Sequence, residues 1–211
     1  LELADFLAAH GSGQQLLAEL LPLEAGSRND PGILKQVARL YLAAGSPQRS
    51  MNIYAALIHD NPADPANYTG FGEAELALGD YRRAQTAFQN ALRHGAPEKD
   101  LEPQIQLAQT LSELDPTPRP LSSVEKLSRA DRILQLARDA LALCPGAQGA
   151  AQKIADADKL LSAQIQAPAN ELAEQRLSMA QNLWRARTAA CGSNTPAEMK
   201  PLSLILSKLA M

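Results

Sequence analysis

The chain has 211 residues, enough for one elongated domain or two small ones, and its hydrophobic residues make up 45% of the total. Only 4% of the residues are aromatic, so we expect a core of aliphatic side chains in closely packed helices. The net charge of -3 offers no long-range attraction for polyanions, which argues against nucleic acid as a partner. No apolar run is long enough to span a bilayer, so no membrane insertion is predicted.

The first 98 residues predict three helical hairpins in one register. Their turns are expected at Gly11, at Gly45-Ser46 and at Gly79-Asp80, which follow one another at a constant interval. Apolar residues recur at helical spacing on both sides of each turn. A single hairpin cannot bury its own apolar face, so we expect the three units, about 1–30, 31–64 and 65–98, to stack.

The side chains expected to pack between these helices occupy matching places in each unit. They are Leu3, Ala4, Leu7, Leu16, Leu20 and Leu23 in the first unit, Leu34, Val37, Ala38, Tyr41, Ser50, Tyr54 and Leu57 in the second, and Tyr68, Phe71, Gly72, Ala84, Phe88 and Ala91 in the third.

A fourth unit, 99–145, begins with a helix that carries Ile105, Ala108 and Leu111 on one face. Residues 115–121 then bring three prolines in close succession, a rigid connector that a helix interior would not tolerate. Ser122 followed by Glu125 predicts the N-terminal cap of a long second helix. We interpret the remaining residues, 146–211, as a helical cap on the open end of the stack.

This pattern resembles the tetratricopeptide repeat, whose period of about 34 residues equals the interval between the predicted turns. The match lies in Tyr68, Phe71 and Gly72 before the third turn and in Ala84, Phe88 and Ala91 after it, and it is strongest over 31–98. The resemblance implies an all-α fold: a tetratricopeptide-like right-handed superhelix of helical hairpins, here with a helical C-terminal cap.

The resemblance also implies that the first helix of each hairpin lines a concave groove that binds a peptide or protein segment. Its exposed positions form the predicted partner-binding groove. Basic members would meet an acidic side chain or a terminal carboxylate, apolar members would form a floor, and Asp100 in the same row would repel a carboxylate. The groove residues are Lys35, Arg39, Leu42, Thr69, Glu73, Leu76, Gln104 and Leu107.

No catalytic, cofactor-binding or metal-binding residue is predicted. His10, His59 and His94 fall near the C-terminal ends of three different predicted helices, where an imidazole interacts with exposed carbonyl groups. None of the known nucleotide-binding, metalloprotease or serine-hydrolase motifs is present.

Cys144 and Cys191 each follow the end of a predicted helix. If the two helices lie side by side, their ends can meet in a disulfide, which would imply an exported protein. Two buried apolar thiols are the alternative, and only geometry distinguishes them.

The leading prediction is therefore a non-catalytic protein-protein interaction scaffold. One alternative is an assembly or structural component of a bacterial envelope complex. Because the chain starts at Leu1, removal of an N-terminal signal or anchor stays open, and with it a cytoplasmic or periplasmic location. Another alternative is a small-ligand or enzymatic pocket between the last repeat and the cap, near Trp184 and the proline connector.

Overall fold

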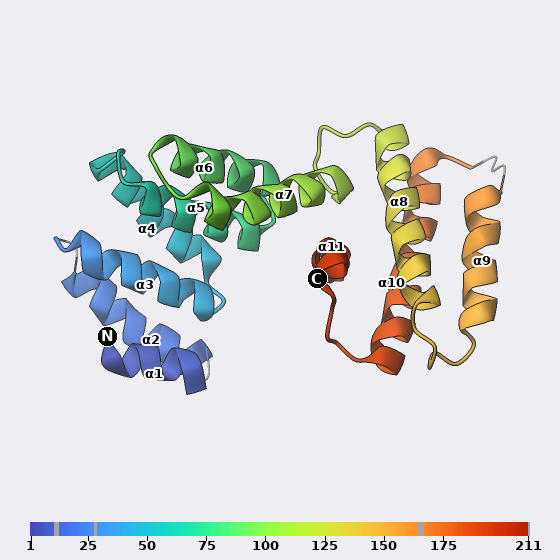
Figure 1. The fold of residues 1–211 in the computed structure, drawn as a ribbon, viewed down its shortest axis with the longest axis horizontal. Helices are drawn as coiled ribbons and strands as arrows, with labels where there is room; N and C mark the ends of the chain where they lie inside the picture. The colour runs from blue at the N-terminus through green and yellow to red at the C-terminus, as the bar shows by residue number, and fades with distance from the viewer. Residues whose placement is uncertain (11–12, 28, 164–166, 211) are drawn as a thin grey trace. The chain divides into compact units, whose positions relative to one another are not determined.

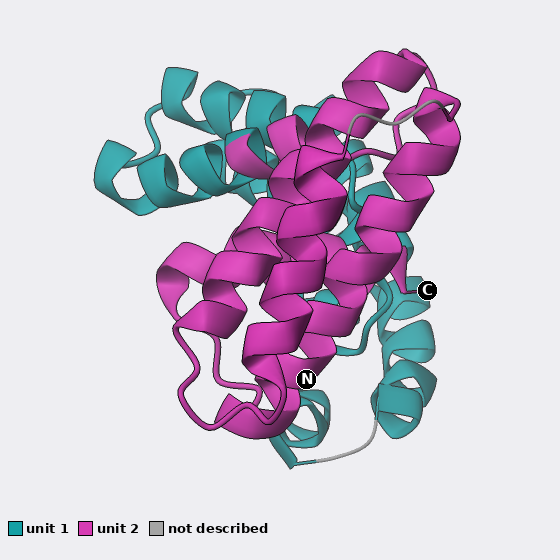
Figure 2. Ribbon diagram, turned by 90° about the vertical axis from the view of Figure 1, so that its right-hand side faces the viewer, with its two compact units in different colours: residues 1–109 teal, residues 110–211 magenta. Residues whose placement is uncertain are grey.

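The computed structural model describes residues 1–10, 13–27, 29–163 and 167–210. These residues form eleven α-helices and one short 3-10 helix, with no β-strand among them, so the predicted all-α class is confirmed. The chain divides into two compact units, unit 1 (residues 1–109) and unit 2 (residues 110–211) (Figure 2). The turn predicted at Gly11 lies outside the described residues.

In unit 1, consecutive helices between residues 2 and 93 pack against each other in chain order (Figure 1). The second and third hairpins keep a common spacing, because the interval from the start of α3 to the start of α5 equals the interval from the start of α4 to the start of α6. The helices of this unit are α1 (Glu2–His10), α2 (Gly13–Gly26), α3 (Pro31–Ala43), α4 (Pro47–Asp60), α5 (Pro65–Leu78), α6 (Tyr81–Arg93) and the greater part of α7 (Glu98–Leu114).

The helix boundaries follow from local chemistry. Asp30 caps α3 by accepting hydrogen bonds from two backbone N–H groups, each at 3.0 Å, and Asp64 caps α5 by accepting one from Ala66 at 2.9 Å. A proline follows each cap at the first helical position. Gly79 then ends α5 with a φ of 79°, a left-handed conformation that glycine adopts without strain.

Most of the predicted packing residues are buried, including Val37, Tyr41 and Phe88 at 0% exposure. The prediction is wrong for Leu3, which is 56% exposed, because α1 is the outermost helix of unit 1 and the core takes Ala4 from it instead. Tyr68 and Phe71 are only half-buried. They lie at the outer edge of α5, where polar side chains cover them: Tyr68 stacks on His94 at 4.9 Å, and Arg83 lies 5.4 Å above the Phe71 ring.

Two glycines of α5 allow close contacts with the neighbouring helices of unit 1. A Cβ atom added at Gly70 would lie 2.1 Å from Cζ of Tyr54 on α4, and one added at Gly72 would lie 2.6 Å from Cε1 of Phe88 on α6. Both distances are far below van der Waals contact, so the two rings occupy the space that any larger residue would need.

Unit 2 contains α8 (Ser123–Ala142), α9 (Ala150–Ser162), α10 (Ala169–Cys191), the 3-10 helix η1 (Ala197–Met199) and α11 (Lys200–Leu209). The long helices α8 and α10 share the largest contact, and α9 and α11 each touch both (Figure 1). Ser122 caps α8, as predicted, by accepting a hydrogen bond from the backbone N–H of Glu125 at 3.2 Å.

The division at 109/110 differs from the predicted boundary at 145/146. The expected fourth repeat would pair α8 with α7, but α8 buries Ile133, Leu134 and Leu141 within the bundle that it forms with α9, α10 and α11. Arg176 of α10 links three helices of that bundle. The residue is 4% exposed, and its guanidinium donates hydrogen bonds to Asp131 of α8 and to the carbonyl of Leu160 of α9.

The proline-rich connector is anchored inside unit 2. Asp115, 2% exposed, accepts hydrogen bonds from Thr117 and forms an ion pair with Lys208 of α11 at 2.7 Å. Arg129 of α8 donates to the carbonyl groups of Ser112 and Asp115, both at 2.7 Å. The first of these bonds satisfies the Ser112 carbonyl, whose helical donor four residues on would be Pro116, which has no N–H.

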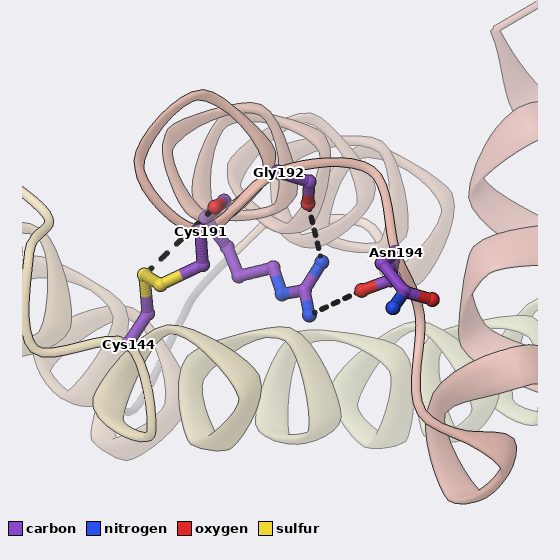
Figure 3. The surroundings of a disulfide bond; sticks show 5 residues. Cys144, Cys191, Gly192 and Asn194 are labelled. Atoms are coloured by element: carbon purple, nitrogen blue, oxygen red, sulfur yellow. Dashed lines mark hydrogen bonds between the residues drawn. A yellow bond between two sulfur atoms is a disulfide. The ribbon is translucent and has the colours of Figure 1, made fainter.

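A disulfide joins Cys144 and Cys191, with the two Cα atoms 6.1 Å apart (Figure 3). It connects the residues at the C-terminal ends of α8 and α10, because these helices lie side by side as the disulfide alternative requires. The segment after Cys191 is held by Arg187, which donates to the carbonyl groups of Gly192 at 2.9 Å and Asn194 at 3.0 Å (Figure 3).

Gly70→Ala is expected to lower the free energy of unfolding by about 2 kcal/mol, because the new methyl group must displace the Tyr54 ring. Urea unfolding followed by far-UV circular dichroism measures the loss. The control is Gly26→Ala, where a Cβ atom meets nothing within 4 Å, and it is expected to leave stability unchanged or slightly raised. Equal midpoints for the two variants would contradict the close packing at Gly70.

Loss of the disulfide is expected to destabilise unit 2 by up to about 4 kcal/mol, since the bond closes a loop across 47 residues of separation. The measurement compares urea unfolding of the full chain with and without a reducing agent. A Cys144→Ser, Cys191→Ser double variant serves as the control. Its free energy of unfolding should equal that of the reduced chain and should not change when the reducing agent is added. A reduced chain as stable as the oxidised one would overturn this expectation.

Candidate binding groove of unit 1

A groove of about 510 Å³ opens between the first helices of successive hairpins in unit 1. Helices α3 and α5 and the start of α7 supply its walls, and Tyr54 reaches it from α4. Its lining residues are Arg39, Tyr54, Pro65, Ala66, Thr69, Gly70, Glu73, Gly95, Ala96, Pro97, Asp100 and Leu101.

Three of the eight predicted groove residues line this space, namely Arg39, Thr69 and Glu73. The structure places the other five elsewhere. Leu76 packs against the core around Phe88. Leu42, Gln104 and Leu107 are half-buried on α3 and α7, outside the lining of the groove, and Lys35 is engaged in an ion pair.

Sequence reasoning missed the residues that form the floor and one end of the groove. Tyr54 was expected only as a packing residue, yet its ring, 1% exposed, closes the bottom of the space above Gly70. Ala96 and Pro97 enter from the connection between α6 and α7, which the repeat period does not specify. The glycine at position 70 was the one available signal, because a glycine inside a helix marks a close approach of another group.

The charges in the groove are only partly balanced. Burial raises the pKa of the Glu73 carboxyl group, and the nearby Arg39 guanidinium opposes that shift without cancelling it. Burial likewise raises the pKa of the Tyr54 phenol, whose hydroxyl group donates to the carbonyl of Lys35 at 3.4 Å. The site therefore combines a cation, a desolvated carboxylate and a phenol within one cavity.

Lys35 serves the scaffold. Its ammonium group donates to Asp64, the residue that caps α5, so it ties α3 to the start of the next hairpin. This hydrogen bond is the largest cause of a lowered pKa at Asp64, to which the backbone N–H of Ala66 adds. The two side chains are only 26% and 21% exposed, so the pair is shielded from solvent more than a surface ion pair is.

Other hollows occur in the described residues, among them three that each lie within one unit. One of about 360 Å³ lies between α4, α5 and α6 beside Tyr68, Phe71 and Arg83, and one of about 470 Å³ lies between α2, α3 and α4. The last, of about 440 Å³, lies beside Trp184 between α10 and α11. The first two of these hollows draw on the second helices of successive hairpins, α4 with α6 and α2 with α4, and not on the row of first helices.

Glu75 is a buried acidic residue of α5. The residue is 1% exposed, and its carboxylate pairs with Arg83 at 2.9 Å. Burial raises the pKa of Glu75, and Arg83 opposes the shift. The pair belongs to the contact between α5 and α6 and lies apart from the groove lining.

The described residues contain no group of three or more His, Cys, Asp or Glu side chains placed to hold a metal ion. His10, His59 and His94 lie at or near the C-terminal ends of α1, α4 and α6, as predicted. Among the described helices, none is long and apolar enough to cross a membrane.

No family model, curated protein or solved structure matches the chain. The groove, the disulfide and the repeat pattern of the chain are therefore the features that indicate its function.

Lys35→Met is expected to lower the free energy of unfolding by about 1 kcal/mol near neutral pH, because Asp64 loses its shielded partner. Since the folded state lowers the pKa of Asp64, the stability from this pair is present above the ordinary carboxyl pKa of about 3.9 and is lost as pH falls through the lowered value. The difference between the variant and the unaltered chain should therefore shrink on acidification.

Urea unfolding at a series of pH values measures this difference, and an NMR titration of Asp64 should show its pKa rising in the variant. Lys99→Met on α7 is the matched control, because Lys99 is exposed and belongs to none of the ion pairs of the described residues. A pH-independent loss for Lys35→Met would contradict the assignment to Asp64.

Proposed function

We propose that the protein is a non-catalytic interaction module that binds a peptide or protein segment in the groove of unit 1. The observation that carries the proposal is the origin of the lining: α3 and α5 are the first helices of successive hairpins, α7 is the helix that follows the second of these hairpins, and all three contribute to one cavity. A cavity shared by several helices of a repeat suits an extended peptide segment.

We propose the finer fold class for unit 1 as well, a tetratricopeptide-like right-handed superhelix. Two observations support it. The helix starts recur at one constant interval over two hairpins, from Pro31 to Pro65 and from Pro47 to Tyr81. Gly72 lies against Phe88 in the arrangement that the small and large positions of the repeat signature require. In such a stack the packing residues set the spacing of the hairpins, and the residues between them face the ligand.

The disulfide favours a second, compatible role. Disulfides form and persist in oxidising compartments, of which the bacterial periplasm is one. The bond between Cys144 and Cys191 thus supports the proposal that the protein is an assembly component of a bacterial envelope complex. In that role the groove would hold a segment of another subunit.

The groove proposal is tested by filling the cavity. Thr69→Trp on α5 places an indole where a ligand would lie, and Gln89→Trp on α6 is the matched control, because Gln89 is exposed and lines none of the hollows described above. A displayed library of short random peptides is enriched on the unaltered full chain. Fluorescence anisotropy then measures the affinity of the enriched peptides for each variant.

We expect Thr69→Trp to weaken peptide binding at least about tenfold and Gln89→Trp to leave it unchanged, with both variants folded by circular dichroism. Peptides that bind both variants equally well would show that they bind elsewhere. Failure to enrich any peptide that depends on the groove would overturn the proposed function.

A further inference from the structure

The groove contains more negative than positive charge. Glu73 and Asp100 face it from α5 and α7, and Arg39 faces it from α3. Lys35, the nearest other predicted cation, is paired with Asp64. In the part of the chain that the structure describes, neither Glu73 nor Asp100 belongs to an ion pair. The groove lining therefore carries two carboxylates and one guanidinium.

The apolar lining suits the stem of a long basic side chain. Ala66, Ala96, Pro97 and Leu101 present methyl and methylene groups in the same cavity, and the Tyr54 ring lies at its floor. Lysine and arginine bury their methylene groups along such surfaces while the charged end meets a carboxylate. An acidic or phosphorylated side chain would instead approach two carboxylates of its own sign.

We propose that the groove recognises a peptide segment through one lysine or arginine side chain, whose charged end binds Glu73 and Asp100. This inference rests on the proposed function, because it names the ligand chemistry of that same groove. The Arg39 guanidinium repels a cationic ligand and so contributes to selectivity. Two carboxylates outweigh this repulsion for one basic side chain, but a peptide with several adjacent basic residues would be disfavoured.

Burial of the Glu73 carboxylate also favours a basic ligand. A carboxylate in a cavity loses hydration, and a cation delivered by the ligand replaces part of it with a charge-assisted hydrogen bond. Without a ligand, the lost hydration of the Glu73 carboxylate is only partly replaced by interactions within the protein. The charged end of a basic ligand would supply the missing interaction.

Three pools of short peptides test the proposal. They have randomised flanks and capped ends, and they differ only in a central residue that is arginine, leucine or glutamate. Affinity for the unaltered full chain is measured by fluorescence anisotropy at low and at high salt. We expect the arginine pool to bind about tenfold more tightly than the glutamate pool, with the preference falling as salt rises.

The isosteric variant Glu73→Gln, Asp100→Asn should abolish that preference. Its matched control is Glu102→Gln, on the same helix as Asp100 but outside the groove lining, which should keep the preference. Arg39→Gln should strengthen binding of the arginine pool, and this gain of affinity cannot come from misfolding. Circular dichroism and thermal unfolding confirm that each variant is folded.

Two failures are distinguishable with the variants used for the groove itself. If peptides lose binding on Thr69→Trp but the three pools bind alike, or the preference survives neutralisation of both carboxylates, this inference is overturned and the proposed function stands. If no pool depends on Thr69, both are overturned.

Discussion

The close approach of α5 to its two neighbours is the constraint on which unit 1 depends. Gly70 lies under the ring of Tyr54 and Gly72 under the ring of Phe88, so two nearby glycines of α5 bring α4 and α6 against the same helix. The contact that seats Tyr54 also makes it the floor of the groove. The same glycines thus determine both the packing of unit 1 and the candidate site. Because Gly70 has no side chain, the Tyr54 ring can lie against α5 and form the floor of the cavity.

Those features that arise from neighbouring residues were predictable from the sequence. An aspartate followed by proline marks the starts of α3 and α5, and a glycine with positive φ ends α5, because caps and turns are decided within a few residues. The buried positions of α6 followed from helical spacing in the same way. The repeat period then extended these local rules to whole hairpins.

The groove was less predictable because its membership depends on contacts between hairpins. Lys35 and Arg39 look alike in the sequence, one turn apart on α3, yet only Lys35 lies where Asp64 can reach it. Leu76 and Glu73 are likewise close together on α5, and the rotation of that helix sends one to the core and the other to the cavity.

The ion pair between Lys35 and Asp64 has a mechanical consequence for how the groove is built. One repeat period after Lys35 and Asp64 the sequence has Thr69 and Glu98, which do not carry opposite charges. The ion pair that joins α3 to α5 is therefore not repeated by the equivalent residues of α5 and α7. The α7 wall is held by apolar contacts such as those of Leu101 and Ala108 with the core of α6. Apolar contacts are not directional, whereas a shielded ion pair fixes a geometry. The α3 wall of the groove is therefore joined to α5 by a directional contact, whereas the α7 wall, which carries Asp100, is joined to its neighbours by contacts that are not directional.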